Sequence, residues 1–205
     1  METKDYLNYL VKEIHTCIVA TVDEEGLPVT AAIDMMDSNE RGLVFLTARG
    51  KSFYERLKAR SFLALTALKG EDTLSSKAIS LRGKVRELGY APIPELLEKN
   101  PYMYEIYPTE ASRQALTAFQ IYEGEGEWFD LSVRPIERAS FTFGKASGKA
   151  EGYFIRETCS GCGKCLSVCP QDCIREGAPF RIEQEHCLHC GNCLAVCPCA
   201  AVEKR

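Results

Sequence analysis

Eight of the eleven cysteines in this 205-residue chain fall into two runs with the same spacing. Each run reads C-x2-C-x2-C-x3-C-P, and the runs end at Pro170 and Pro198. Thiolates with this spacing are typical ligands of cubane 4Fe–4S clusters. The repeat therefore predicts two such clusters. The cysteines are Cys159, Cys162, Cys165 and Cys169 in the first run, and Cys187, Cys190, Cys193 and Cys197 in the second.

The last cysteine of each run is expected to bind the cluster of the other run. The first three thiolates can bind three corners of one cluster, whereas the fourth follows a short helical turn and points away. Cluster one is then expected to take Cys159, Cys162, Cys165 and Cys197. Cluster two is expected to take Cys187, Cys190, Cys193 and Cys169.

Zinc and disulfides are the competing uses of these cysteines. Zinc sites commonly combine two C-x2-C pairs across a longer gap, which the triple runs do not resemble. Disulfide frameworks belong to secreted chains, and METKDYLNYL at the start lacks the features of a secretory signal. Both alternatives are therefore disfavoured. Cys17 is expected to be a buried free thiol, and Cys173 and Cys199 are expected to be small hydrophobic residues packed beside the clusters. An additional ligand role is the other interpretation of Cys173 and Cys199.

The two runs belong to an internal duplication with an offset of 28 residues. Leu166 corresponds to Leu194, and Val168 corresponds to Val196. The segment 152–205 resembles a bacterial two-cluster ferredoxin in this respect. A module of that size buries little apolar surface, so the clusters are expected to supply much of its folding energy.

Composition limits what the rest of the chain can be. The apolar content is 45%, the charged content is 26% and the formal charge is −4, without a concentrated basic stretch. No run approaches the roughly 18 apolar residues of a membrane span. We therefore expect no nucleic-acid or membrane partner. The oxygen-sensitive clusters and the lack of secretory-signal features lead us to expect a cytoplasmic protein. The length accommodates two domains, expected at residues 1–148 and 149–205, with a glycine-containing linker at 143–152.

Short strand-like segments separated by turn residues dominate the first domain. Helices are expected at residues 3–16 and 52–60 from their apolar spacing. The segment 123–126, Glu-Gly-Glu-Gly, is expected to turn a final hairpin. This pattern favours a small, mostly antiparallel barrel. The expected strands are 17–22, 28–35, 43–47, 61–68, 78–87, 118–122 and 127–133.

The order of several short motifs resembles the split-barrel flavoproteins of the pyridoxamine 5′-phosphate oxidase-like superfamily. The motifs are GLPVT at 26–30, GLVFLT at 42–47, GKS at 50–52 and SLRGKV at 80–85. In those proteins FMN lies at the interface of a homodimer, so the resemblance implies an FMN cofactor and a homodimer. The expected fold is mostly β: a split β-barrel flavoprotein domain followed by a small α+β two-cluster ferredoxin domain.

Thr47, Lys51 and Ser52 form the candidate site for the FMN phosphate. Lys51 and Ser52 stand where a helix is expected to begin, and free N–H groups together with the helix dipole favour an anion there. The competing interpretation is that Ser52 only caps the helix and that Lys51 is a solvated loop residue. The resemblance favours the flavin. It also implies that the isoalloxazine ring is lined by Thr30, Ala31, Ala32 and Ile33.

Two features depart from the oxidase itself. Met35 and Met36 stand where the oxidase carries a lysine for its phosphorylated substrate, and the cysteine runs replace its basic C-terminal segment. Pyridoxamine phosphate oxidation is therefore not expected. The catalytic residues are unknown, and His15 is equally compatible with a structural role.

The leading hypothesis is an oxidoreductase that couples two-electron flavin chemistry to one-electron transfer through the clusters. The loaded ferredoxin domain would be acidic, because each oxidised cluster with its thiolates adds about −2. The expected electron partner is a redox protein or a nicotinamide. The alternatives are a non-catalytic electron carrier or redox sensor, and a haem- or flavin-storage barrel with an accessory ferredoxin. The sequence does not identify the substrate.

Overall fold

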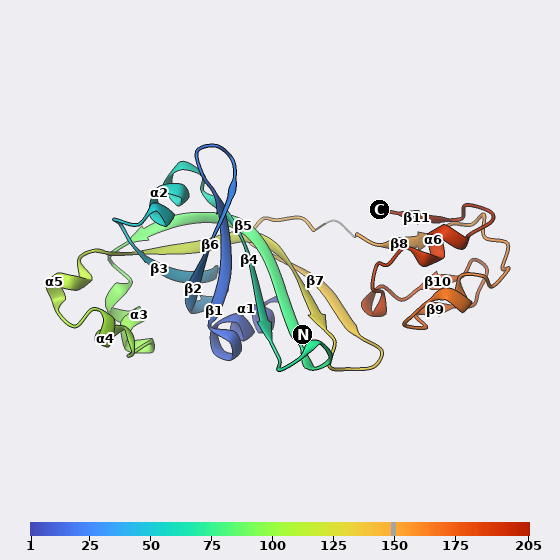
Figure 1. Cartoon of the computed structure of the whole chain (residues 1–205), viewed down its shortest axis with the longest axis horizontal. Coiled ribbons are helices and arrows are strands. Elements are labelled where there is room, and N and C mark those ends of the chain that lie inside the picture. Colours follow the sequence, from blue (N-terminus) through green and yellow to red (C-terminus); the bar gives the residue numbers. More distant parts are fainter. Residues whose placement is uncertain (149–150) are drawn as a thin grey trace. The chain divides into compact units, whose positions relative to one another are not determined.

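The computed structural model describes residues 1–148 and 151–205 and divides them into two compact units (Figure 1). The larger unit comprises Met1–Lys69, Ala78–Trp128 and Ser140–Ser147. The smaller unit comprises Gly70–Lys77, Phe129–Ala139 and Gly148–Arg205. The linker expected at 143–152 includes residues 149–150, which lie outside the described residues.

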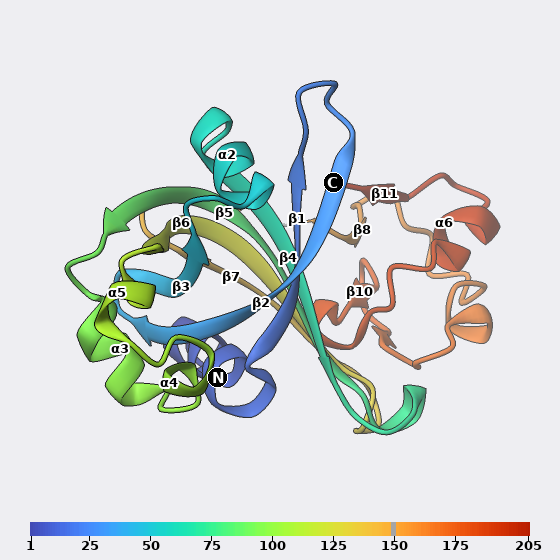
Figure 2. The ribbon, with the colours of Figure 1, turned by 60° about the vertical axis from the view of Figure 1, so that its left-hand side comes forward.

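Six strands close into a barrel, as the mostly β expectation required (Figure 2). The sheet order is β3-β2-β1-β4-β5-β6-β7, and an antiparallel pairing of β3 with β6 closes the ring. The strand β7 pairs with β6 beyond the closure. The strands are β1 Thr16–Val22, β2 Pro28–Asn39, β3 Gly42–Ala48, β4 Phe62–Lys69, β5 Lys77–Gly89, β6 Leu116–Asp130 and β7 Glu137–Phe143.

Short helices fill the connections between these strands. The expected helix at 3–16 is present as α1, Thr3–Tyr9, which continues into a π-helical turn, Leu10–Ile14. The expected helix at 52–60 is confirmed as α2, Ser52–Ala59. A 3₁₀ turn, Thr73–Ser75, connects β4 to β5. The long β5–β6 connection holds α3 Ile93–Lys99, α4 Met103–Ile106 and α5 Glu110–Arg113.

The strand β3 is buried on both faces because it separates two apolar clusters. Phe45 stacks on Phe119 of β6, with ring centroids 5.8 Å apart. Val44 and Leu46 alternate with Phe45 along the strand and pack in a second cluster with α3. The continuous apolar run GLVFLT is explained by this two-sided burial.

The prediction of a hairpin turn at residues 123–126 is wrong. The strand β6 continues through these residues, and its hairpin partner is β7, which was not predicted. Gly124 permits close strand packing, since a Cβ there would lie 2.6 Å from the carbonyl oxygen of Arg82. A Cβ on Gly126 would meet the ring of Phe141. These glycines therefore mark close approach of neighbouring backbone and side chains, not a turn.

The smaller unit contains two short hairpin-like sheets that follow the sequence duplication. The strand β8 pairs with β11, and β9 pairs with β10, both antiparallel. Its apolar core combines Tyr153, Ile174, Phe180, Ile182 and Val202 with buried cysteines. The elements are β8 Tyr153–Ile155, η3 Leu166–Val168, β9 Ile174–Arg175, β10 Arg181–Ile182, η4 Gln184–His186, α6 Asn192–Val196 and β11 Val202–Lys204.

Candidate functional site

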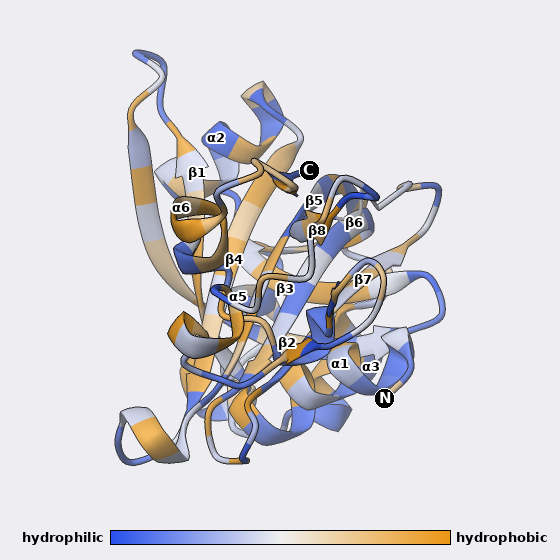
Figure 3. Cartoon of the chain, turned by 90° about the vertical axis from the view of Figure 1, so that its right-hand side faces the viewer, coloured by the Kyte–Doolittle hydropathy of each residue, from blue (hydrophilic) through white to orange (hydrophobic). Residues whose placement is uncertain are grey.

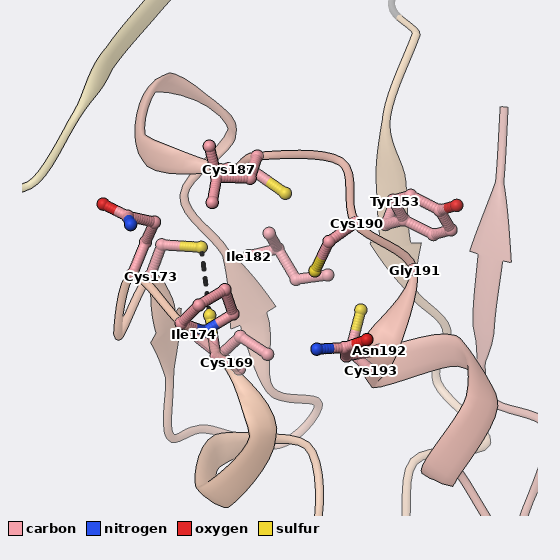
Figure 4. Close-up of a pocket in the computed structure, with 13 residues that line it drawn as sticks. Tyr153, Cys169, Cys173, Ile174, Ile182, Cys187, Cys190, Gly191, Asn192 and Cys193 are labelled. Carbon is pink, nitrogen blue, oxygen red and sulfur yellow. Dashed lines mark hydrogen bonds between the residues drawn. The ribbon is translucent and has the colours of Figure 1, made fainter. Parts of the chain in front are cut away.

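Two cysteine-lined cavities lie within the smaller unit. We name cavity A the space of about 330 Å³ lined by Cys169 of the first run and by three cysteines of the second run. Figure 4 shows their sulfur atoms around this space, with Tyr153 and Ile182 among the other lining side chains. The cysteines of cavity A are Cys169, Cys187, Cys190 and Cys193, together with Cys173.

Cavity B has nearly the same size, and it combines three cysteines of the first run with the fourth cysteine of the second run. Its volume is about 320 Å³, and Ile155, Phe180 and Val202 form part of its apolar lining. Its cysteines are Cys159, Cys162, Cys165 and Cys197, together with Cys199. The structure thus brings together in each cavity the four thiols predicted for one cluster, the exchanged fourth cysteine included.

Local backbone geometry explains this exchange. The short helical segments η3 and α6 separate the third from the fourth cysteine of each run and direct the fourth away. Left-handed Gly161, Gly163 and Gly191 allow the tight loops between the earlier cysteines. Backbone N–H groups already point at sulfur: Ala201 donates to Cys197 Sγ at 3.2 Å, and His189 donates to Cys187 Sγ at 3.4 Å.

The donor set of both cavities fits a cubane cluster. Four thiols with apolar walls and N–H donors to sulfur are the environment that such clusters use. Within the described residues, no three His, Cys, Asp or Glu side chains are grouped closely enough to hold a single metal ion. A cubane is larger than one ion and spreads its ligands over its corners. The ligand roles of the eight cysteines stay a prediction that the donor set supports.

Thr47 is the distinctive residue of the candidate phosphate site. It is the penultimate residue of the buried strand β3 and is only 4% exposed, yet its Oγ1 is buried without a hydrogen-bond partner. A buried hydroxyl without a partner is energetically costly and unusual. The site therefore has an unused hydrogen-bonding group where the sequence predicted an anion.

Lys51 and Ser52 are exposed at the start of α2, close in sequence to Thr47. The N-cap position belongs to Lys51, and no side chain caps the helix. The competing interpretation of Ser52 as an N-cap is therefore wrong. Nearby Arg49 is already engaged, because its guanidinium donates to the carbonyls of Gln114 and Leu116.

The four residues expected to line the flavin ring lie on β2, the neighbour of β3 in the sheet. Thr30 and Ala32 are exposed on the outer face of the barrel, opposite Ala20 and Ile18 of β1. Ala31 and Ile33 alternate with them and are half-buried. Two of the four predicted residues thus share the exposed face, and the strand period places the other two on the opposite face.

Residues 3–131 match the family profile described as pyridoxamine 5′-phosphate oxidase. The chain belongs to the pyridoxamine 5′-phosphate oxidase family. Residues 152–198 match a second profile, described as a 4Fe-4S dicluster domain. The oxidase-like domain is thus followed by a ferredoxin-like domain, which supports a redox, electron-transfer role.

Solved structures show the same barrel as this family member. A NimC/NimA family protein from Clostridium acetobutylicum has a TM-score of 0.57 at 16% identity, covering 68% of this chain and 92% of that one. A protein from the same organism related to general stress protein 26 of B. subtilis has a TM-score of 0.51 at 21% identity, covering 67% and 94%. No curated protein matches the sequence. Among the described residues, no helix is long and apolar enough to cross a membrane.

A polar cluster that the sequence analysis missed surrounds Asp34, in the middle of β2 of this oxidase-family barrel. The carboxylate of Asp34 accepts hydrogen bonds from the hydroxyls of Thr16, at 2.6 Å, and Tyr102, at 2.7 Å. The Tyr102 hydroxyl also lies 2.8 Å from His15 Nε2. Burial by itself would raise the pKa of Asp34. The hydrogen bonds from Thr16 and Tyr102, together with His15, outweigh burial and lower the pKa of Asp34. Burial and the bond to Asp34 raise the pKa of Tyr102.

Asp34 has the same strand parity as Thr30 and Ala32, a signal that could have identified it. Tyr102 comes from the helical insertion between β5 and β6, and no sequence pattern pairs it with β2. Met35 and Met36, which replace the oxidase's lysine position, are 0% and 3% exposed. They belong to the core, so no cationic group for a phosphorylated substrate stands there.

Proposed function

We propose that this chain is an FMN and iron–sulfur oxidoreductase that passes electrons between two 4Fe–4S clusters and a flavin. The main support is the pair of cavities that each bring together the four cysteines predicted for one cluster. These cavities follow, in the same chain, an oxidase-family barrel in which the buried hydroxyl of Thr47 has no hydrogen-bond partner. FMN, when bound, exchanges two electrons at once or one at a time, whereas each cluster carries one. The reaction of the oxidase that names the family is not proposed, because Met35 and Met36 occupy its lysine position.

The phosphate of FMN is proposed to bind where β3 ends and α2 begins. The Thr47 hydroxyl would donate to a phosphate oxygen, and Lys51 would contribute a charge-assisted contact. Ser52 and the uncapped first turn of α2 would add further donors. The outer-face residues of β2 would face the ring, with the Asp34 carboxylate and the Tyr102 hydroxyl as hydrogen-bonding groups beside them.

Two substitutions test this site, and they separate binding from folding. Lys51→Ala is expected to weaken FMN binding by about 1.5–3 kcal/mol without changing stability, because Lys51 is exposed. Thr47→Val is expected to weaken binding while leaving the apoprotein as stable or more stable, since it removes an unpaired buried hydroxyl. Fluorescence titration and thermal unfolding of the apoprotein measure the two effects.

Lys58→Ala is the matched control, because Lys58 lies at the other end of α2 and pairs with Glu87. It should leave FMN affinity unchanged. If Lys51→Ala and Thr47→Val both bind FMN with wild-type affinity, the phosphate binds at another place. Arg82 and Lys84 are the next basic residues to consider for the phosphate, but each already forms an ion pair, Arg82 with Glu125 and Lys84 with Glu123.

The outer face of β1, β2 and β4 is proposed to be the homodimer interface that holds the flavin. Ile18 is 49% exposed and lies opposite Ala32 of β2 and Thr66 of β4. Phe62 and Leu68 of β4 are 49% and 63% exposed. Figure 3 shows β4 coloured mostly as hydrophobic. Small and apolar side chains on three adjacent strands leave a face suited to a planar ring and a second copy.

Ile18→Lys should therefore shift the protein from dimer to monomer and lower its flavin content. Sedimentation of the wild type should give twice the chain mass of 22.9 kDa. Leu74→Lys is the control, because Leu74 is 63% exposed but lies in the 3₁₀ turn between β4 and β5. A wild-type monomer, or a dimer in the Ile18 variant, would contradict this interface.

The coupling itself is tested in the intact chain. Electrons delivered by a photoreductant to the clusters should reach the flavin within one chain or dimer, so the observed rate should not depend on protein concentration. Stopped-flow absorbance at flavin wavelengths over a wide dilution series measures this. A rate proportional to concentration would instead favour the non-catalytic carrier or sensor alternative.

A further inference from the structure

His15 is the one histidine of the larger unit, since the other two of the chain's three histidines belong to the smaller unit. It follows the π-helical turn Leu10–Ile14, and its backbone has φ 67° and ψ −64°, which is strained for any residue other than glycine. Such π-turns and strained residues are frequent at functional sites. The fold therefore holds this imidazole, whose side chain is 32% exposed, at a cost in backbone energy.

The hydrogen bonds around His15 determine which ring nitrogen carries the proton. The ionised Asp34 carboxylate can only accept, so the Tyr102 hydroxyl donates its single proton to Asp34 at 2.7 Å. The Tyr102 oxygen then accepts from His15 Nε2, which lies 2.8 Å away. Nε2 is therefore protonated. Among the described residues Nδ1 has no hydrogen-bond partner, so it is the nitrogen available to a bound molecule.

A second proton on this ring would meet an opposite charge. Asp34 Oδ2 lies 3.5 Å from His15 Nε2, and the hydroxyl of Thr16 also donates to the same carboxylate. The charged side chains of the neighbouring segments, Glu13 and Lys69, pair with each other at 2.6 Å. Histidine is the side chain suited to exchanging protons near neutral pH. The imidazole can therefore take up and release a proton while Asp34 compensates its charge.

This group adjoins the face of β2 that is proposed to hold the flavin ring. Asp34 follows Ala32 by two residues and shares its face, about 7 Å further along the strand. In the register with β1, Thr16 stands opposite Asp34 and Ile18 stands opposite Ala32. The His15 cluster is thus one strand repeat away from the proposed flavin face.

Electron transfer through iron–sulfur clusters creates a need for such a group. Two electrons and one proton convert oxidised FMN into its reduced anion. A hydride donor supplies all of them together, whereas each cluster supplies a single electron and no proton. A barrel that is reduced through clusters must therefore obtain the proton from another source.

We propose that His15 is the catalytic acid that delivers this proton, through Nδ1, when the flavin is reduced by the clusters. Tyr102 and Asp34 are positioning residues, because they act on the flavin only through the imidazole. Proton delivery leaves a neutral ring, which solvent reprotonates because the side chain is partly exposed. Oxidation of the flavin by the clusters returns the proton to Nδ1. This inference rests on the proposed function and adds the route of the proton to it.

The kinetic test uses the full chain, loaded with clusters and FMN and reduced by a photoreductant without oxygen. His15→Ala should retain its FMN and its iron but reduce the flavin about 10²-fold more slowly, the lower end of the contribution of general acids. Added imidazole should restore much of the rate. Tyr102→Phe should slow the reaction less, because the ring of His15 remains.

Two controls separate proton delivery from other effects. Glu13→Ala alters an exposed residue of the turn that precedes His15 and should leave the rate unchanged. Ferricyanide accepts one electron and no proton, so its reduction by the clusters should proceed equally fast in His15→Ala and in the wild type.

Nuclear magnetic resonance of the imidazole nitrogens gives a readout that does not depend on activity. In the full chain the neutral ring of His15 should carry its proton at Nε2, protected from exchange with water by the bond to Tyr102. Tyr102→Phe should abolish that protection. A neutral ring protonated at Nδ1 would contradict the direction of the hydrogen bonds.

The remaining outcomes distinguish this inference from the proposed function. A wild-type rate of flavin reduction in His15→Ala would show that the proton has another source. A slow variant that imidazole does not rescue would show a structural role for His15. Wild-type protein without FMN, or with a flavin that the clusters do not reduce, would overturn the proposed function before any variant is made.

Discussion

Replacing Cys169 by alanine is expected to remove the cluster of the second run and to spare the cluster of its own run. Cys169 lines cavity A with Cys187, Cys190 and Cys193, whereas the other three cysteines of its run line cavity B. Wild-type protein should contain about eight irons and eight sulfides per chain, and the variant should retain about half. Because Cys173 Sγ lies 3.5 Å away, Cys173→Ala is included so that this thiol cannot take the vacated place.

The identity of the lost cluster decides between crossed and local ligation. Cysteine protection from alkylation, mapped by mass spectrometry, should be lost at the second run and retained at Cys159, Cys162 and Cys165. Cys197→Ala is the reciprocal variant and should expose the first run. Exposure of the first run in the Cys169 variant would contradict the crossed assignment.

Removing the iron is expected to unfold most of residues 151–205 while the barrel stays folded. The regular elements of that segment are only two to five residues long, and its core includes the buried Cys187 and Cys193. A domain of about 60 residues buries only about 60% of the surface its unfolded chain exposes, which leaves it marginal without another source of stability. Cluster binding would supply that stability because the ligands are organised only in the folded state.

Hydrogen exchange of the apoprotein, prepared anaerobically with a chelator, measures this difference between the domains. Amides of β8 to β11 should lose protection, whereas those of β1, β3 and β6 should exchange as slowly as in the loaded protein. The barrel serves as the internal control in the same sample. Retained protection in β8 and β11 without iron would show that the apolar core alone is sufficient.

Much of the candidate site could be predicted because its residues are recognised from their spacing over short stretches of the sequence. The spacing of the eight cysteines and the expected helix start at Lys51 and Ser52 depend on neighbours within a few residues, and the helix start is found in the structure. The limit of such reasoning was reached at Gly124 and Gly126, where a turn signal marked close packing against Arg82 and Phe141.

The sequence by itself determined the cysteine sets, the two-domain order and the mostly β barrel, since these arise from spacing, duplication and strand period. Only the tertiary structure showed that Thr47 Oγ1 has no partner, that Cys173 lies against Cys169, and that Tyr102 reaches Asp34. Hydrogen-bond satisfaction is a property of every neighbour around an atom, and Tyr102 and Asp34 are separated by 68 positions in the chain. Such contacts exist only after the barrel closes and the β5–β6 insertion packs, so no local pattern encodes them.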